Sequence, residues 1–432
     1  MTLYPAPNRM SGQSDDLGTV AFRAFIALEI AAAIFAVFLF CDAHVKLIVG
    51  NNPDNADSPL LRVIWLPFYA IGVMGLVLGG RRAFYGLLIA IPFLAFAILA
   101  MVSTLWSGDP DLTSRRGFAL LMTTVFGVYL GVRFSWRTFA EIVAAGMALV
   151  AIGSAVLAIA VPSLGLMQDE HAGAWAGLVA EKNQLGAAMV RGLVASVLAM
   201  ALAPPSRRWL WGCIALLCIA EVLLSTSKTS LLALAAAVAI LCGVRIICFA
   251  PNIATAGTWA AVSAVAFFLI VTLQFPEEFL RALGREPTLT SRTDIWAAIQ
   301  PFMEAKPWLG WGYQAFWRDP LGPAVEIRNQ LDFHVRHAHH GWRETMLGNG
   351  YVGTGLMALC LLMPALASLV RIFVWPYGAC VLAFVASLFI ISLSEATLGG
   401  SNSIITVLLV AYTIKLLLPD PPSLAAPVQW RP

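Results

Sequence analysis

Long apolar runs separated by short polar segments cover most of the chain. A run of ~20 residues is long enough to cross the ~30 Å hydrocarbon core of a bilayer as an α-helix, and the sequence holds about twelve such runs. The predicted spans are residues 21–41, 61–80, 83–105, 117–133, 139–161, 185–203, 209–225, 229–250, 255–274, 351–371, 375–393 and 403–418. The pattern therefore predicts an all-α polytopic membrane protein.

Composition agrees with this prediction. Of the 432 residues, 59% are hydrophobic and only 12% are charged, which lies outside the usual range of soluble domains. All seven cysteines lie within or beside apolar runs, as is typical of small core residues. No internal repeat, low-complexity tract or soluble domain interrupts the pattern, so we expect residues 1–432 to form a single membrane domain.

Basic residues beside short loops predict the orientation, because Lys and Arg favour the cytoplasmic side of a membrane. They fall at alternate span junctions, namely at Arg9, Arg23, Arg81, Arg82, Arg133, Arg137, Arg207, Arg208, Arg245, Arg371 and Lys415. With an even number of spans, residues 1–20 and 419–432 are then both expected to be cytoplasmic tails. We expect no cleaved signal peptide before the first span.

Residues 275–350 break the apolar pattern and are predicted to form one large loop on the outer face. This loop holds about a third of the charged side chains of the chain. Arg292 in the loop, and Arg115, Arg116, Lys182 and Lys228 elsewhere on the same face, lie on the side that the charge bias disfavours. An anionic ligand held at the outer face explains them, and the formal net charge of +3 requires no nucleic-acid partner.

Two of these cations lie beside predicted features that suit an anion. Ser291 and Asp294 form an S-x-x-D capping box, which puts Arg292 in the first turn of a helix that runs to about residue 305 and includes Trp296. A helix N-terminus itself favours anions. Lys228 lies in a tight hairpin among hydroxyl side chains, and an ionisable residue so close to the bilayer is a site candidate by default.

Other outer-face residues leave two interpretations open. Glu181, Lys182 and Asn183 stand at the entrance of a span, where they could form a helix cap or part of a site; the disfavoured side on which Lys182 lies favours a site. Glu395, at the outer end of another span, could be a capped surface acid or a site residue. The turn Gly310-Trp311-Gly312 suits a sugar-binding surface and a structural turn equally well.

Four of the six histidines lie close together, at His334, His337, His339 and His340. Their H-x-x-H-x-H-H spacing fits no strong metal signature, although Glu344 is near. A general base needs only one histidine, held beside its substrate. The pattern favours a base or an electrostatic role over plain interfacial histidines, and both over a metal site.

The order of these elements resembles the bacterial superfamily of O-antigen ligases and of O-antigen and exopolysaccharide polymerases. The segments that carry the resemblance are Leu105-Trp106-Ser107 with Asp109-Pro110, Glu181-Lys182-Asn183 with Leu185-Gly186, Ser225-Thr-Ser227-Lys228-Thr229, Arg292-Thr-Asp-Ile-Trp296, Lys306-Pro-Trp-Leu-Gly310-Trp-Gly312, and His337-Ala-His339 followed by Gly350-Tyr-Val-Gly353. Each is weak alone, but together they cover most of the chain from the third span onward. The run at residues 283–290 is most similar to the exopolysaccharide polymerase branch.

The resemblance implies a glycosyltransferase of the GT-C type that uses an undecaprenyl-diphosphate-linked glycan as donor and needs neither a metal nor a cofactor. Arg292, with Arg115, Arg116, Lys182 and Lys228, would hold the diphosphate. His339 matches the histidine proposed in the family as the base that activates the acceptor hydroxyl group. The family usually has Asn at the next position, where this chain has His340, so both histidines remain candidates. Glu181 and Glu395 fall at acidic positions of this branch, with Asn183, His337 and Trp296 as supporting residues.

The function implied is polymerisation of lipid-linked repeat units at the periplasmic face of the bacterial inner membrane. The acceptor is then a second lipid-linked repeat unit. Membrane lipids are expected around the protein, and a chain-length regulator protein is a candidate partner. A ligase that transfers the finished glycan to lipid A core is the alternative within the family. A transporter of the lipid-linked glycan is the alternative of another class, but it is expected to hold its charges near the bilayer midplane rather than at one face.

Overall fold

The computed structural model describes residues 17–50, 59–168, 171–249, 292–319, 321–331, 335–372, 374 and 376–420. Throughout these ranges the regular structure is helical, and strand pairing is limited to one isolated bridge between Leu166 and Trp175. The predicted span at 255–274, the run at 283–290, Ser291, His334 and most of both predicted tails lie outside the described residues. The prediction of an all-helical protein is confirmed.

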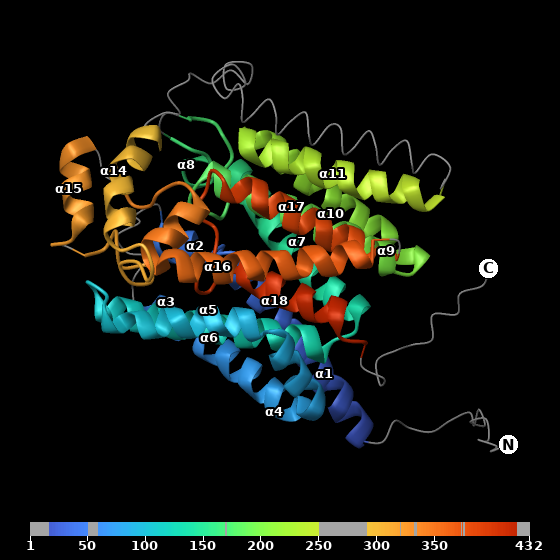
Figure 1. Ribbon diagram of the computed structural model, residues 1–432. Coiled ribbons are helices and arrows are strands. Elements are labelled where there is room, and N and C mark those ends of the chain that lie inside the picture. Colours follow the sequence, from blue (N-terminus) through green and yellow to red (C-terminus); the bar gives the residue numbers. More distant parts are fainter. Residues whose placement is uncertain are drawn as a thin grey trace, which may run out of the picture.

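The helices are labelled as in Figure 1. They are α1 (Leu17–Phe40), α2 (Val45–Val49), α3 (Pro59–Val63), α4 (Leu66–Ile89), α5 (Ile91–Val102), α6 (Pro110–Arg133), α7 (Trp136–Ala160), α8 (Pro162–Gly165), α9 (Lys182–Leu202), α10 (Pro205–Leu224), α11 (Lys228–Phe249), α14 (Arg292–Ala305), α15 (Pro323–Leu331), α16 (Gly341–Val370), α17 (Tyr377–Ser392) and α18 (Ile404–Leu417).

Six helical segments of the described chain are long and apolar enough to cross a membrane: Arg23–Phe40, Leu61–Ile89, Trp136–Ala160, Lys182–Leu202, Lys228–Ile246 and Gly341–Val370. Three shorter apolar helices accompany them, at Ile91–Leu105, Tyr377–Ser392 and Ile404–Leu417. The protein is therefore a polytopic membrane protein. The figure of about twelve spans stays a prediction.

Two predicted helix boundaries appear as breaks inside continuous helical segments. Gly80 in α4 has φ 51° and Gly350 in α16 has φ 62°, a left-handed backbone that glycine adopts without penalty. The apolar pattern predicts a span junction between residues 80 and 83 and the start of a span at residue 351. Both positions coincide with the breaks.

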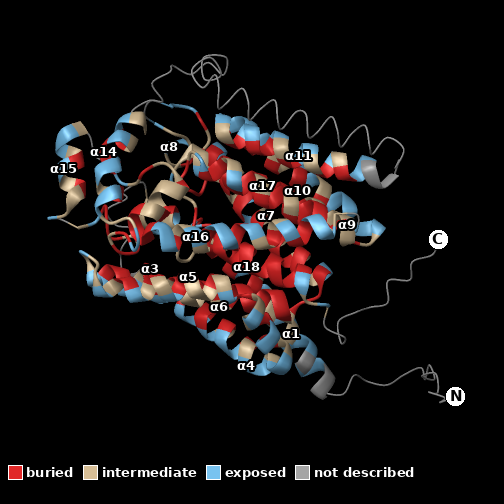
Figure 2. Cartoon of the chain, in the orientation of Figure 1, coloured by how far each residue is buried: buried red, intermediate tan, exposed pale blue. Residues whose placement is uncertain are grey.

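Buried residues concentrate in the middle of the bundle, along α7, α9, α17 and α18 (Figure 2). Small residues let α6 approach α18 closely. A Cβ atom on Gly127 would lie 2.9 Å from Val410 Cβ, and one on Gly131 would lie 2.9 Å from Ile414 Cβ. This is the close helix packing that small residues four apart permit inside membranes.

The described part of the polar stretch forms a small helical unit at one end of the bundle (Figure 1). It contains α14 and α15, which surround an apolar cluster of their own that includes Ile299, Trp317 and Ile327. Helix α14 ends at Ala305, as predicted, and carries Arg292 in its first turn; the predicted N-cap Ser291 lies outside the described residues. The stretch therefore holds Arg292 on an ordered helix.

The turn Gly310-Trp311-Gly312 fastens this unit to α16. Trp311 N–H donates to Leu347 O at 2.8 Å, and Gly312 N–H donates to Gly348 O at 3.0 Å. Gly310 and Gly312 both have positive φ, and a Cβ on Gly310 would lie 2.6 Å from the backbone of α16. Of the two interpretations of this turn, the structure supports the structural one.

Candidate functional site

The loop of residues 335–340 holds the histidines and is fixed on both sides. The indole Nε1–H of Trp296, on α14, donates to Ala338 O at 2.9 Å. Ala338 N–H in turn donates to Glu344 Oε2, on α16, at 2.8 Å. These bonds join the two helices through the loop, so the histidines are held in one arrangement.

His337 and His339 lie against each other within this loop. Their ring centroids are 4.0 Å apart, and His339 N–H donates to His337 Nδ1 at 3.3 Å. His339 has a left-handed backbone, with φ 48°, which is uncommon for a residue with a side chain. Its Nδ1 is buried without a hydrogen-bond partner among the described residues. Such strain and such an unpaired atom cluster at functional sites.

Burial lowers the pKa of His339 to about 3, and the neighbouring His337 and Arg292 lower it further in the same direction. Burial, followed by the charges of Arg292 and Arg336, lowers the pKa of His337 to about 4. Both imidazoles are therefore neutral at neutral pH. A neutral imidazole has a nitrogen lone pair that can accept a proton.

His340 lies differently from His339. It occupies the N-cap position of α16, where its Nδ1 accepts from Arg343 N–H at 3.5 Å. Its ring meets the Trp296 ring edge-on at 5.4 Å, while the Arg343 guanidinium lies 5.0 Å from the centre of that indole. The two candidate histidines thus have different surroundings. His340 caps α16, whereas His339 lies against His337.

Glu395 is the buried carboxyl group beside the histidine loop. It accepts from Asn183 Nδ2 at 2.9 Å and forms an ion pair with Arg292, whose NH2 lies 3.3 Å from Glu395 Oε1. Burial raises the pKa of Glu395 to about 7; Arg292 and Asn183 act to lower it, and Glu181 acts to raise it. Glu395 is therefore buried and paired, which argues against the capped surface acid.

Four helices begin around Glu395. Asn183 and Arg292 bring the first turns of α9 and α14 to its carboxyl group. Thr229, in the first turn of α11, accepts from the Ser394 hydroxyl at 2.9 Å. At the start of α16, a Cβ atom on Gly341 would lie 3.2 Å from Glu395 O. Helix N-termini carry partial positive charge, so their convergence favours an anion at this point.

The remaining predicted cations divide into two groups. Lys182 and Lys228 are the first residues of α9 and α11, in the same convergence. Glu181 occupies the N-cap position of α9 but makes no side-chain capping bond there, which weakens the cap interpretation of that segment. Arg115 is exposed and donates to Asp111 O of its own helix. Arg116 lies elsewhere, in the pocket described next.

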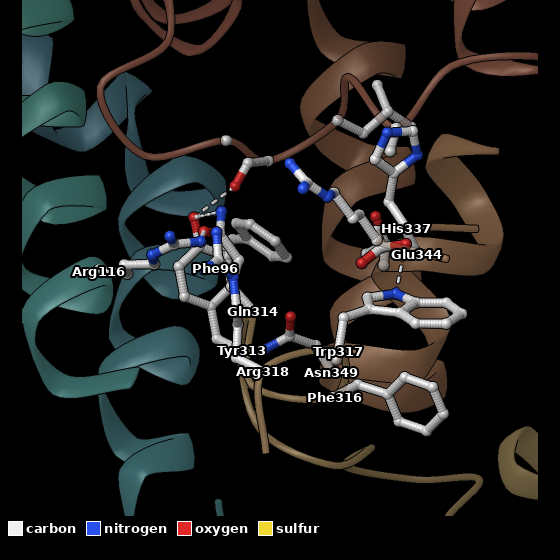
Figure 3. Close-up of a pocket in the computed structure, with 17 residues that line it drawn as sticks. Phe96, Arg116, Tyr313, Gln314, Phe316, Trp317, Arg318, His337, Glu344 and Asn349 are labelled. Carbon is white, nitrogen blue, oxygen red and sulfur yellow. Dashed lines mark hydrogen bonds between the residues drawn. The ribbon is translucent and has the colours of Figure 1, made fainter. Parts of the chain in front are cut away.

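A pocket of about 330 Å³ adjoins the histidine loop (Figure 3). Its polar lining residues include Arg116, Gln314, Arg318, Arg336, His337, Glu344 and Asn349. Arg116 approaches from one side, and His337 and Glu344 lie on the opposite side. The sequence analysis predicted Arg116 and His337 as site residues and noted that Glu344 is near the histidines. It did not predict the remaining lining residues; for Arg318 and Arg336 the sequence showed only a high number of arginines in the polar stretch.

The described residues contain no group of three or more His, Cys, Asp or Glu side chains placed to hold a metal ion. His334 lies outside these residues. The histidines that are described make contacts to each other, to aromatic rings and to backbone groups, as given above.

Two comparisons with known proteins bear on this site. Residues 213–358 match the O-antigen ligase family. These residues include Lys228, Arg292 and the whole histidine loop. The chain is also 26% identical over 322 residues to the exopolysaccharide production protein ExoQ of Rhizobium meliloti (strain 1021), which covers 72% of this chain and 70% of the relative.

These two matches support the superfamily of O-antigen ligases and polymerases. Together with the long apolar helices, they point to an integral membrane protein of the kind found in polysaccharide production.

Proposed function

We propose that the protein is a glycosyltransferase that polymerises undecaprenyl-diphosphate-linked repeat units at the periplasmic face of the bacterial inner membrane. One observation carries the proposal. Helices α9, α11, α14 and α16 begin around Glu395, and Arg292 at this point is close enough to His339 to help keep its imidazole neutral. An anion-binding group next to a proton acceptor is what transfer of a sugar from a diphosphate requires.

The cations and helix N-termini hold the donor diphosphate. As the bond between the anomeric carbon and the diphosphate oxygen breaks, its electron pair passes to the diphosphate. The guanidinium and ammonium groups stabilise that charge, and each such donor is worth roughly 10²- to 10³-fold in rate. Because these side chains supply the positive charge, the proposed reaction needs no metal ion.

His339 takes the proton of the acceptor hydroxyl group as its oxygen attacks the anomeric carbon. The imidazole is neutral in the free protein because burial, His337 and Arg292 lower its pKa. A bound diphosphate offsets the charge of Arg292 and so favours protonation of His339 when the proton arrives. A base of this kind contributes roughly 10²- to 10⁴-fold in rate.

Polymerisation is preferred to ligation because the chain is similar to ExoQ, which is described as an exopolysaccharide production protein. A ligase would use the same donor chemistry and differ only in its acceptor, lipid A core. Transport of the glycan is a weaker proposal, since α14, which contacts Glu395 and the histidine loop, lies at one end of the helix bundle rather than halfway along it (Figure 1).

The test is an assay of purified protein in liposomes with a synthetic lipid-diphosphate oligosaccharide. We expect longer glycan chains and one released lipid diphosphate for each repeat unit added. If the glycan crosses the bilayer without being lengthened, the protein is a transporter. If it is lengthened only when lipid A core is supplied, the protein is a ligase.

A further inference from the structure

The pocket beside the histidine loop has an excess of positive charge. Arg116, Arg318 and Arg336 line it, against the single carboxyl group of Glu344. Glu344 is already bound by protein donors, since its Oε2 accepts from Ala338 N–H and from Trp317 Nε1–H. The carboxyl group of Glu344 thus already has two donors within the protein. The three arginines make the pocket suitable for an anion.

One buried polar atom in the pocket lacks a partner. Asn349, on α16, is 2% exposed and lines the pocket, yet its Nδ2 makes no hydrogen bond to the described residues. A buried donor without a partner costs about 1–3 kcal/mol. A ligand oxygen in the pocket would satisfy it. This observation is independent of the arginine charges and also indicates an acceptor-rich ligand.

Arg318 differs from Arg116 in what it already binds. Arg116 NH1 donates to Gln314 Oε1 at 2.6 Å. The exposed side chain of Arg318 makes no hydrogen bond or ion pair within the part of the chain that the structure describes. Its guanidinium can therefore bind a ligand without first breaking a contact to these residues.

His337 connects this pocket to the proposed base. Its ring lines the pocket and also lies against the His339 ring, with 4.0 Å between centroids. Arg292 and Glu395, where the donor diphosphate is proposed to bind, are not among the lining residues of the pocket, although Arg292 is close enough to His337 to lower its pKa. A glycan seated in the pocket would thus lie beside His337, next to the proposed base His339.

We propose that this pocket binds a carboxylate-bearing sugar of the acceptor glycan. The proposal rests on the proposed glycosyltransferase function and adds the charge and position of its second substrate. A carboxylate has two oxygens that match the paired N–H groups of arginine. The pocket then selects acidic repeat units and presents a hydroxyl group of the same glycan to His339.

The test uses two synthetic acceptors that differ only in one sugar, glucuronic acid in one and glucose in the other. Wild-type protein is expected to give a higher kcat/KM with the acidic acceptor. Arg318→Gln should lower kcat/KM for the acidic acceptor by about tenfold to a hundredfold, the range of a charge-assisted hydrogen bond. With the neutral acceptor it should stay within about twofold of wild type, because a neutral sugar forms no ion pair with Arg318 that the substitution could remove.

Arg137→Gln is the matched control, since Arg137 pairs with Glu141 on α7, away from the pocket. It should leave both acceptors unchanged. Activity of Arg318→Gln on the neutral acceptor shows that the variant is folded. Equal losses on the two acceptors would overturn the proposal, as would wild-type protein that lacks a preference for the acid. If wild-type protein lengthens neither acceptor, the proposed function itself fails.

Discussion

Arg292 is the residue whose replacement most directly disturbs the proposed donor site. Its guanidinium lies 3.3 Å from Glu395 Oε1 and is close enough to lower the pKa of His337 and His339. Arg292→Gln removes the charge and keeps a side chain that can donate hydrogen bonds. The change therefore tests the charge rather than the bulk of the residue.

The size of the effect follows from the role of the charge. Loss of one preorganised donor to a developing anion costs about 2.7–4 kcal/mol, or roughly 10²- to 10³-fold in kcat. Without Arg292 the pKa of Glu395 should rise further, because Arg292 is the strongest influence that lowers it. Arg292→Lys keeps the charge but not the paired N–H groups, so its loss should be smaller.

The assay is single-turnover release of lipid diphosphate by purified protein. Arg137→Gln is the control, because the exposed Arg137–Glu141 pair within one helix is worth only about 0.3–0.5 kcal/mol. We expect Arg292→Gln to retain wild-type thermal stability to within a few degrees while release slows. Release at the wild-type rate would refute the assignment of Arg292 to the diphosphate.

Two further predictions concern the histidine loop. Trp296→Phe removes the indole hydrogen bond to Ala338 O and weakens the Arg343 contact, so kcat/KM should fall roughly 5- to 30-fold, as expected for about 1–2 kcal/mol; an unchanged kcat/KM would show that this bond does not position the base. Glu395→Gln removes a carboxyl group whose pKa is raised by burial to about 7 and which would itself titrate in this range. In this variant kcat/KM should stay level from about pH 8 to about pH 5, since His339, with a pKa of about 3, is unprotonated throughout. A histidine of ordinary pKa would lose about thirtyfold over this range, and such a loss would contradict the buried, neutral His339.

Much of the fold could be predicted because it depends on local patterns. The length of the apolar runs predicts membrane helices, and the capping box with Lys306-Pro307 predicts the start and end of α14. Gly80 and Gly350 marked breaks because glycine alone adopts their backbone freely. The left-handed backbone of His339, in contrast, has no such signal in the sequence.

The site was predictable only as a set of residues, not as an arrangement. Asn183 and Glu395 are 212 positions apart, and no periodicity relates them. The separate surroundings of His339 and His340 depend on Trp296, on another helix. Asn349 was missed because a single amide in a helix has no pattern of its own.

The most direct test of the account compares His339→Ala with His340→Asn in single-turnover transfer. His339→Ala should slow transfer by roughly 10²- to 10⁴-fold, the contribution of a general base. His340→Asn should stay within about fivefold of wild type, because Asn is an equally good N-cap and the bond from Arg343 N–H is long, at 3.5 Å. Wild-type transfer by His339→Ala, or an equal loss in His340→Asn, would contradict the assignment of His339 as the base.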